Sequence, residues 1–500
     1  MPAPRVTAAT IQPTAARPAF PSWMDWRFAA GLVLLGGLLA AMVPTARVPG
    51  TMLAYLNLVV IAAAWVYFAR RRTLEGLIPV MFLTWLAAAW PLGSIYFALV
   101  SPDLTYATAA GTREFLYGGV RLQAVTLLFT VTYVAVMLFF QGRSIPWRTP
   151  VGTPWMDRRT ATVVLWIAMT AITFNAVSKV APFPGLLQYV ADGGYHTLNG
   201  LTLVVGVMFT SLAWRTRLTA LAFLLVAGTF YAIGNARGMA GLPAALFLVG
   251  LIFLSDLNPR WKRWTVIAAL AAFPLAMVLS NTTRLVTKSI GFRDLNARMD
   301  ALNEWQDVLS NTPVLASTFG RLFFVGGHTI ITLSPDYYPY VDFNAPRYAY
   351  EFMMRMLPKR FFGDLYYSEQ PNRILRLYGF LITDETSVPL STVGALYMLG
   401  GVLPVAIGGV LIGGFHSALG YGLRRARRRS PYLAVFVFAM LSAELLWGQN
   451  RDPISHVRGM VWDSLWGVIL FQLVVRPLVG DVVPLRRSVR PVRPVGVRAA

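Results

Sequence analysis

The sequence has no cysteine, little charge and almost no lysine. Without cysteine the chain can form no disulfide, no thiolate metal site and no cysteine nucleophile. Charged residues make up 13% of the chain, about half the share that a soluble domain usually carries. Apolar residues make up 56%, and the mean hydropathy is +0.56. This composition predicts a polytopic membrane protein.

The motifs of several large enzyme classes are also missing. No G-x-x-x-x-G-K-[ST] stretch is present, which excludes a P-loop, and no dinucleotide fingerprint follows a strand. There is no H-E-x-x-H pair and no other histidine and carboxylate spacing typical of a metal site. We therefore expect neither a bound metal nor a nucleotide cofactor.

About twelve apolar segments are long enough, or nearly so, to cross the ~30 Å hydrocarbon layer of a membrane. Two of them, 198–212 and 218–233, are short and are expected to tilt less or to re-enter. The predicted spans are 28–44, 51–69, 76–99, 118–140, 161–180, 198–212, 218–233, 238–256, 264–280, 391–415, 431–448 and 458–475. The predicted fold is an all-α polytopic membrane protein, with helices over 27–280 and 391–475.

The basic residues predict how these helices are oriented. The net charge is +22, and nearly all of it is arginine. With a cytoplasmic N-terminus, most basic residues fall in inner loops and tails, including the "RRARRR" run at 424–429. We expect 1–26, which lacks the pattern of a secretory signal, and 476–500 to be cytoplasmic tails. The charge is then a topology signal and an attraction to anionic lipids, and no nucleic acid is expected as a partner.

The segment 281–390 is then one large extracytoplasmic loop. Its acidic and basic residues balance, and it is too long to be a mere connection. The stretch "DLNARMDALNEWQDVL" places Leu295, Met299, Leu302 and Trp305 on one helical face. We expect an amphipathic helix that rests on the membrane or on the end of the helix bundle.

Charged side chains inside the membrane are costly, so their position is informative. Each one is predicted near the outer end of its span, and they are Arg121, Lys179, Arg237, Glu444 and Asp463. They could reach the headgroups, or form structural ion pairs such as one between Glu444 and Arg458. Together they also fit a polar cavity that opens outward. Transporters prefer sites near the midplane, so this outward bias disfavours transport without excluding it.

Three stretches carry a resemblance to a known family. The first is "LPKRFFGD" (357–364), which "TDETSVPLST" (383–392) follows. The second is a Gly-x-x-Tyr helix start at Gly394 and Tyr397 that leads into a glycine-rich span. The third is the turn "GNARGMAG" (234–241). In these features the chain resembles the bacterial oligosaccharide repeat-unit polymerases, the Wzy-type O-antigen polymerases.

The resemblance implies a GT-C-like bundle in the bacterial plasma membrane that works without a metal. It also implies transfer of a growing glycan on undecaprenyl diphosphate to the next lipid-linked repeat unit, at the outer face. Partners would be the lipid-linked donor and acceptor, membrane lipids, and chain-length regulator and flippase proteins. The family's helix start often carries Glu and Asn where this chain has Ala395 and Leu399. Acid chemistry attributed to that Glu is therefore not carried over.

Without a metal, arginines would neutralise the leaving diphosphate, because the guanidinium fork pairs with phosphate oxygens and stays charged. The candidates are Arg237 at the tip of its turn, Arg284, Arg373 and Arg376. Arg237 could instead cap the turn, and the loop arginines could form solvated ion pairs.

A general base would take the proton of the acceptor hydroxyl. The candidates are His328, Asp384, Glu385 and Glu444. A structural histidine, or acids that pair with a helix dipole, would be the alternative. We expect His416 at the cytoplasmic end of span ten, away from the chemistry, and we expect His456 outside.

The glycines of span ten predict close helix packing, with a groove for a polyprenyl tail as the alternative. Three other functions remain open. One is a lipid-linked glycan ligase or other GT-C transferase, for which Asp103 and Glu114 are the acids of the first outer loop. The others are a polysaccharide transporter or flippase, which would need polar groups at mid-membrane, and a scaffold without activity.

Overall fold

The computed structural model of the chain describes residues 17–18, 24–42, 48–71, 73–100, 105–107, 113–115, 120–140, 148–149, 156–180, 184, 195–233, 237–269, 350, 353–354, 391–447 and 452–479. These ranges cover most of the two regions in which helices are predicted. Within 281–390 the structure describes residues 350, 353 and 354, and the predicted amphipathic helix lies outside the described residues.

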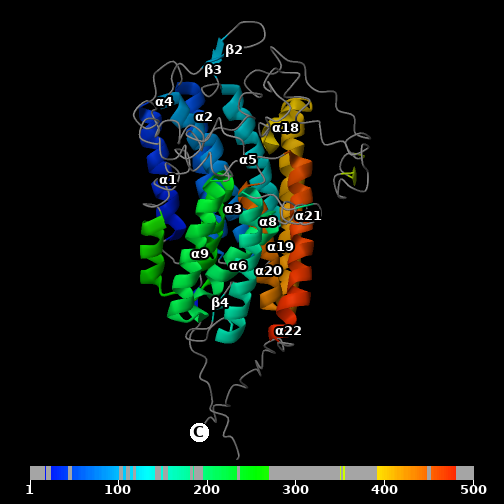
Figure 1. Cartoon of the computed structure of the whole chain (residues 1–500). Coiled ribbons are helices and arrows are strands. Elements are labelled where there is room, and N and C mark those ends of the chain that lie inside the picture. The colour runs from blue at the N-terminus through cyan, green and yellow to red at the C-terminus, as the bar shows by residue number, and fades with distance from the viewer. Residues whose placement is uncertain are drawn as a thin grey trace, which may run out of the picture.

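The described chain is helical apart from four very short strands (Figure 1). The first region contains α1 (Met24–Ala41), α2 (Val48–Arg70), α3 (Leu77–Ala87), the π-helix η2 (Ala88–Leu92), α4 (Gly93–Val100), α5 (Val120–Phe140), α6 (Arg158–Val180), α8 (Tyr195–Met208), the 3-10 turn η3 (Phe209–Ser211), α9 (Trp214–Ile233), α10 (Arg237–Val249), the π-helix η4 (Gly250–Leu254) and helical residues 259–269. The second contains α18 (Thr392–Met398), α19 (Val402–Arg429), α20 (Pro431–Trp447), α21 (Pro453–Leu470), the π-helix η8 (Phe471–Val475) and α22 (Arg476–Val479). The strands pair as β1 (Arg17–Pro18) with β4 (Arg148–Thr149) and β2 (Thr105–Ala107) with β3 (Arg113–Phe115).

Among the described residues, six helical stretches are long and apolar enough to cross a membrane, namely 49–70, 77–96, 120–140, 158–178, 402–429 and 453–478. Three shorter apolar stretches accompany them, at 199–211, 241–254 and 431–446. Helices suit this setting because a helix satisfies its own backbone hydrogen bonds where no water is available. The chain is thus an all-helical membrane protein, while the count of twelve spans stays a prediction.

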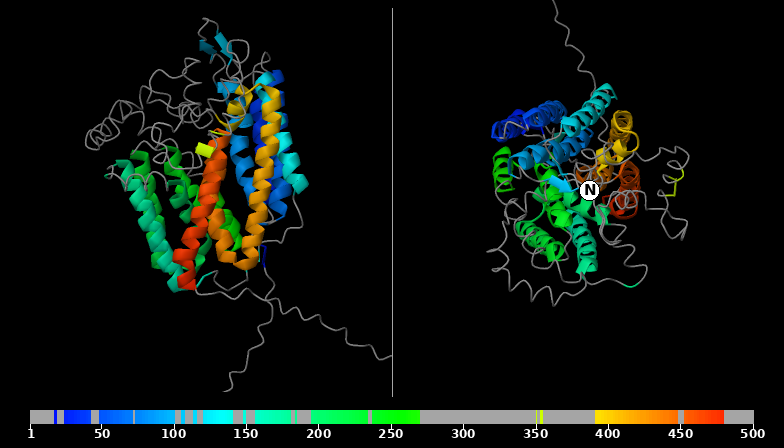
Figure 2. Two further views of the ribbon diagram at one scale, coloured as in Figure 1. Left: turned by 90° about the vertical axis from the view of Figure 1, so that its right-hand side faces the viewer. Right: turned by 90° about the horizontal axis from the view of Figure 1, so that it is seen from above.

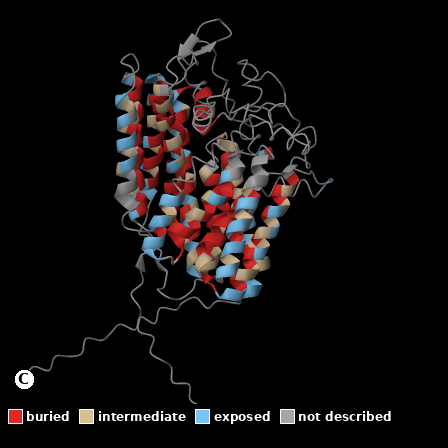
Figure 3. Cartoon of the chain, turned by 60° about the vertical axis from the view of Figure 1, so that its left-hand side comes forward, coloured by how far each residue is buried: buried red, intermediate tan, exposed pale blue. Residues whose placement is uncertain are grey.

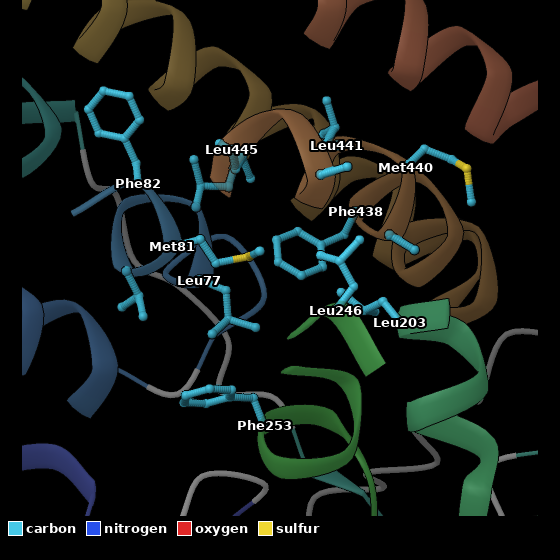
Figure 4. Close-up of a cluster of buried hydrophobic side chains, with 14 of the residues drawn as sticks. Leu77, Met81, Phe82, Leu203, Leu246, Phe253, Phe438, Met440, Leu441 and Leu445 are labelled. Carbon is cyan, nitrogen blue, oxygen red and sulfur yellow. The ribbon is translucent and has the colours of Figure 1, made fainter. Parts of the chain in front are cut away.

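The helices stand side by side in one bundle, as the two views of Figure 2 show. Figure 3 shows that their outward faces are exposed, and the exposed residues include many large apolar ones, so lipid suits these faces better than water. Phe139 is 81% exposed, and Leu34 and Leu411 are each 66% exposed. Inside the bundle, α20 packs among α3, α8 and α10, where Phe438, Met81 and Leu246 meet (Figure 4).

Basic residues gather at one end of the bundle, which we call the arginine end. Because successive helices run in opposite directions, α2 and α19 finish there while α6 and α9 begin there. The Nε atom of Arg424 in α19 lies 3.7 Å from Oε1 of Glu75, which sits in the turn between α2 and α3. Burial raises the pKa of the Glu75 carboxyl. A backbone hydrogen bond and the positive charges of Arg424 and Arg427 oppose this rise only in part. The buried carboxylate thus ties the α2–α3 turn to the basic end of α19.

A second polar network joins neighbouring turns at the arginine end. The hydroxyl of Thr210, after α8, donates a hydrogen bond to the carboxylate of Asp256, after η4. Nearby, the Nζ atom of Lys262 donates to the carbonyl of Ser255 at 2.8 Å. Burial lowers the pKa of Lys262 to about 8, and the opposite charge of Asp256 works against that shift.

The predicted span 391–415 is divided in two. Helix α18 ends at Met398, and α19 begins at Val402 after a break at Gly400 (φ 138°) and Gly401 (φ 78°). These backbone conformations are open to glycine and rare for other residues. Ser391 starts α18 with φ 58°, and its hydroxyl accepts a hydrogen bond from the Gly394 N–H at 3.1 Å. The long span is therefore 402–429, farther along the chain than predicted.

The glycines of α19 bring that helix close to α5, as the packing prediction required. A Cβ at Gly409 would lie 2.1 Å from the Thr132 hydroxyl oxygen and 3.1 Å from the Phe129 carbonyl oxygen. A Cβ at Gly413 would lie 3.0 Å from the Tyr133 carbonyl oxygen. This close approach sets which side chains of α5 and α19 can meet.

Candidate functional site

Four polar side chains from four different helices meet inside the bundle. They are Tyr133 of α5, His416 of α19, Glu444 of α20 and His456 of α21, and each is 0% exposed. We call these four residues the polar array. Because burying polar groups in an apolar setting is costly without partners, such a set calls for an explanation.

The four side chains form a linear sequence of contacts. The Tyr133 hydroxyl oxygen lies 2.9 Å from Nδ1 of His416. Nε2 of His416 lies 3.3 Å from Nε2 of His456. Nδ1 of His456 lies 3.5 Å from Oε1 of Glu444, which is ion-pair distance. Both ring nitrogens of His416 thus have hydrogen-bond contacts, whereas Nδ1 of His456 faces the carboxylate at ion-pair distance without a hydrogen bond.

The polar array lies halfway along the bundle. Counted in residues along α19, His416 lies well before Arg429, the last residue of that helix. Glu444 lies the same number of residues after Pro431, the first residue of α20. At 1.5 Å per residue both are about 20 Å from the arginine end. The prediction that His416 lies at the cytoplasmic end was wrong, because α19 continues to Arg429. Glu444 does lie near the end of its helix, but α20 is short, so its carboxyl is level with the middle of α19.

Local sequence explains where His456 lies. Asp452 caps α21, since one carboxylate oxygen accepts from the Ser455 N–H at 3.1 Å, and Pro453 occupies the start of the helix. The backbone N–H of His456 then donates to the Asp452 carbonyl at 3.0 Å. This cap places His456 in the first turn of α21, near the end of α20 that carries Glu444.

Gly459 lets Glu444 lie against the backbone of α21. A Cβ at position 459 would lie 2.7 Å from the Glu444 carboxyl carbon and about as close to both carboxylate oxygens. Gly459 is less than one helical turn beyond His456. The two residues therefore form one wall around the carboxylate.

Aromatic rings enclose the other end of the polar array. The ring of Phe82 on α3 has its centre 4.6 Å from that of Tyr133, 4.9 Å from that of His416 and 5.9 Å from that of His456. Phe129 stacks on Tyr133 with ring centres 6.4 Å apart. The Tyr133 ring thus packs against other aromatic rings, and its hydroxyl has His416 as a hydrogen-bond partner.

The contacts allow the following arrangement of protons. If Glu444 is ionised, His456 carries its proton on Nδ1, which faces the carboxylate. Its bare Nε2 then accepts from the Nε2–H of His416, whose bare Nδ1 accepts from the Tyr133 hydroxyl. In this arrangement the protons point toward Glu444.

The structure places the predicted site residues unevenly. Glu444 joins the array, and Arg237 is the first residue of α10, although its side chain is outside the described set. The other candidates lie outside the described residues, and they are His328, Asp384, Glu385, Arg284, Arg373 and Arg376. Among the described residues, no group of three or more metal-ligating side chains could hold an ion.

Sequence reasoning missed Tyr133, His416 and His456, and the expectation that His456 lies outside was wrong, because its side chain is buried in the bundle. One signal could have found His416, because it shares a helical face with Gly409, Gly413 and Gly420. That face packs against α5 and the α2–α3 turn, so a polar residue on it must be buried and must have a partner.

The comparisons with known proteins add no relative to this picture. No protein-family model, curated protein or solved structure matches the chain.

Proposed function

We propose that the chain is a repeat-unit polymerase, a glycosyltransferase that joins polyprenyl-diphosphate-linked oligosaccharides at the outer face of the plasma membrane. The observation that supports it is the buried Glu444–His456 pair, with 3.5 Å between Oε1 and Nδ1. An imidazole beside a carboxylate holds the carboxylate in place, and a positioned carboxylate can accept a proton as a general base. Glycosyl transfer to a hydroxyl needs such an acceptor.

The position of the pair fits an outward-facing reaction. Glu444 and His456 flank the connection between α20 and α21, which joins the helix ends that point away from the arginine end. If basic residues mark the cytoplasmic side, this connection faces outward. Lipid-linked sugars on the outer leaflet would then approach from the side of the carboxylate.

Arg237 fits the role of diphosphate ligand in this arrangement. It is the first residue of α10, and α10 contacts α20, the helix that carries Glu444. The start of a helix attracts anions, and an arginine there adds a permanent positive charge. The base and the anion site would thus lie toward the same end of the bundle.

The reaction balances with these groups. The acceptor hydroxyl oxygen forms a bond to the anomeric carbon of the donor, while the bond from that carbon to the diphosphate oxygen breaks. The diphosphate leaves with the electron pair, and the arginines neutralise it. The hydroxyl proton passes to the Glu444 carboxylate, because both ring nitrogens of His456 already face Glu444 and His416.

The test is the surface-glycan ladder of a deletion strain that carries each variant. Loss of a general base typically slows a reaction about 10²–10⁴-fold, so Glu444→Gln and His456→Gln should leave capped single units. Glu75→Gln is the matched control, because it makes the same change in a buried carboxyl at the arginine end. Full-length ladders from both site variants would refute the assigned base. A deletion strain with normal glycan would refute the polymerase.

A proton-coupled transporter is the second candidate, and the mid-bundle position of the polar array favours it. Transport by alternating access needs a polar path on both sides of the site. The aromatic closure around Tyr133 weighs against such a path in the described residues. Proton uptake by proteoliposomes, dependent on a pH gradient and abolished in Glu444→Gln, would favour the transporter.

A further inference from the structure

We propose that an anionic phospholipid binds at the arginine end of the bundle, with its phosphate held between the start of α9 and the start of the helix 259–269. The site consists of exposed residues from these two helix starts, which we call the lipid patch: Trp214, Arg215, Arg260, Trp261 and Trp264. The proposal does not depend on the polymerase, because the glycosyl transfer is assigned to the opposite side of the membrane.

The two helix starts lie next to each other because the turns before them are hydrogen-bonded. Thr210, four residues before α9, donates from its hydroxyl to the carboxylate of Asp256, three residues before the helix 259–269. Arg217, in the first turn of α9, donates from its guanidinium to the carbonyl of Thr210. These contacts bring residues 46 positions apart in the sequence to one place at the arginine end.

The tryptophans of the lipid patch are exposed at the same end of the bundle. Trp214 is 66% exposed, Trp261 is 65% exposed and Trp264 is 64% exposed. Tryptophan prefers the border between the headgroups and the hydrocarbon, because its ring is apolar and its N–H can donate a hydrogen bond. The three rings therefore mark the level at which lipid headgroups meet this end of the protein.

An apolar face continues from the tryptophans along the bundle. On α9, Leu218, Leu221 and Leu225 follow Trp214 at spacings of four, three and four residues, so all four share one helical face. Each of these leucines is exposed, and so is Ile267 on the neighbouring helix. At 1.5 Å per residue the α9 face is about 17 Å long, which is roughly the depth of one leaflet. An acyl chain can therefore lie along it.

The charge of the two turns suits a phosphate. The segments 210–217 and 255–263 contain five basic residues and one acidic residue, Asp256, which is engaged by the hydrogen bond described above. Within the described part of the chain, no acidic side chain pairs with Arg215 or Arg260. A guanidinium group stays charged and can donate two N–H groups to phosphate oxygens. Arg215 and Arg260 are thus the phosphate ligands of the proposed site.

The apolar face favours a lipid over an acidic polypeptide. An acidic polypeptide would also complement the arginines, but it would bring no apolar group to the tryptophans and leucines beside them. A phospholipid carries its anionic headgroup and its apolar chains in one molecule. That order matches the order of arginines, tryptophans and leucines from the arginine end along α9.

Native mass spectrometry of the full chain in detergent tests the site, with dioleoyl-phosphatidylglycerol as the probe. Dioleoyl-phosphatidylcholine is the control lipid, because it has the same acyl chains and no net charge. Each basic residue near an anionic headgroup strengthens binding about fivefold, so Arg215→Gln/Arg260→Gln should weaken phosphatidylglycerol binding about 25-fold. Binding of phosphatidylcholine should stay unchanged.

Arg425→Gln/Arg429→Gln is the matched control protein, because it removes the same charge from two exposed positions at the arginine end of α19. It should keep the affinity of the parent protein for phosphatidylglycerol. All four arginines are exposed, so both variants should keep the thermal midpoint of the parent protein without added lipid.

Four results would overturn the proposal. The parent protein could bind both lipids equally, or Arg215→Gln/Arg260→Gln could bind phosphatidylglycerol as the parent does. An equal loss in Arg425→Gln/Arg429→Gln would mean that the attraction is spread over the whole arginine end, without a discrete site. Displacement of the lipid by polyglutamate would favour an acidic polypeptide as the partner.

Discussion

Replacing Gly459 by alanine should push the Glu444 carboxylate out of line with His456. The new Cβ would lie 2.7 Å from the carboxyl carbon, whereas carbon atoms in contact prefer about 3.5–4.0 Å. Glu444 or α21 must therefore move by about 1 Å, and overpacking of this kind costs about 1–3 kcal/mol. Since the Nδ1 to Oε1 distance is already 3.5 Å, such a movement would break the pair.

The measurement is the thermal midpoint in detergent together with the glycan ladder. Gly414→Ala and Gly422→Ala are matched controls, because a Cβ at either position meets no atom within 4 Å. Both controls gain helix propensity of up to about 1 kcal/mol, as Gly459→Ala would, so the comparison isolates the contact with Glu444. A Gly459→Ala protein with the stability and ladder length of the controls would refute the tight seat for the carboxylate.

Three other outcomes follow from contacts outside the polar array. Gly409→Ala should lower the thermal midpoint below that of Gly414→Ala, because its Cβ would meet the Thr132 hydroxyl at 2.1 Å and separate α5 from α19. Equal midpoints for the two variants would contradict this packing. Lys262 is charged in the folded and unfolded states below pH about 8, and between about 8 and 10.5 the folded protein loses that proton first. Stability should therefore rise with pH across that window, by about 3 kcal/mol at most, and Lys262→Met should remove the rise; a slope that persists in Lys262→Met would assign it elsewhere. Arg424→Met should destabilise the protein more than Glu75→Gln, because it leaves the buried Glu75 carboxylate without the cation paired with it. Thermal midpoints in the opposite order would argue against the Glu75–Arg424 ion pair.

Much of the helical fold could be predicted because long apolar runs leave few other choices in a membrane. The runs that became α2, α5 and α6 were found within a few residues of their observed ends. The break before α19 was missed because the chain stays apolar across it. Its cause is backbone geometry at Gly400 and Gly401, which composition does not reveal.

The candidate site was harder to predict because its contacts join distant parts of the chain. Tyr133 and His416 are 283 residues apart, and nothing in the periodicity of either helix says that α5 and α19 are neighbours. Glu444 could be singled out since a carboxylate in an apolar run is rare. His456 is expected outside from the sequence, because its position depends on how far the short α20 reaches into the bundle.

The joint between α18 and α19 has a mechanical consequence. Positive φ angles at Ser391, Gly400 and Gly401 set the seven-residue α18 apart at both ends, so α18 turns away from the axis of α19 as a separate helix. Side chains with a Cβ at 400 and 401 would favour a single continuous rod instead. Residues 392–398 would then extend along the axis of α19, away from the bundle. They would no longer pack beside α5 and α21.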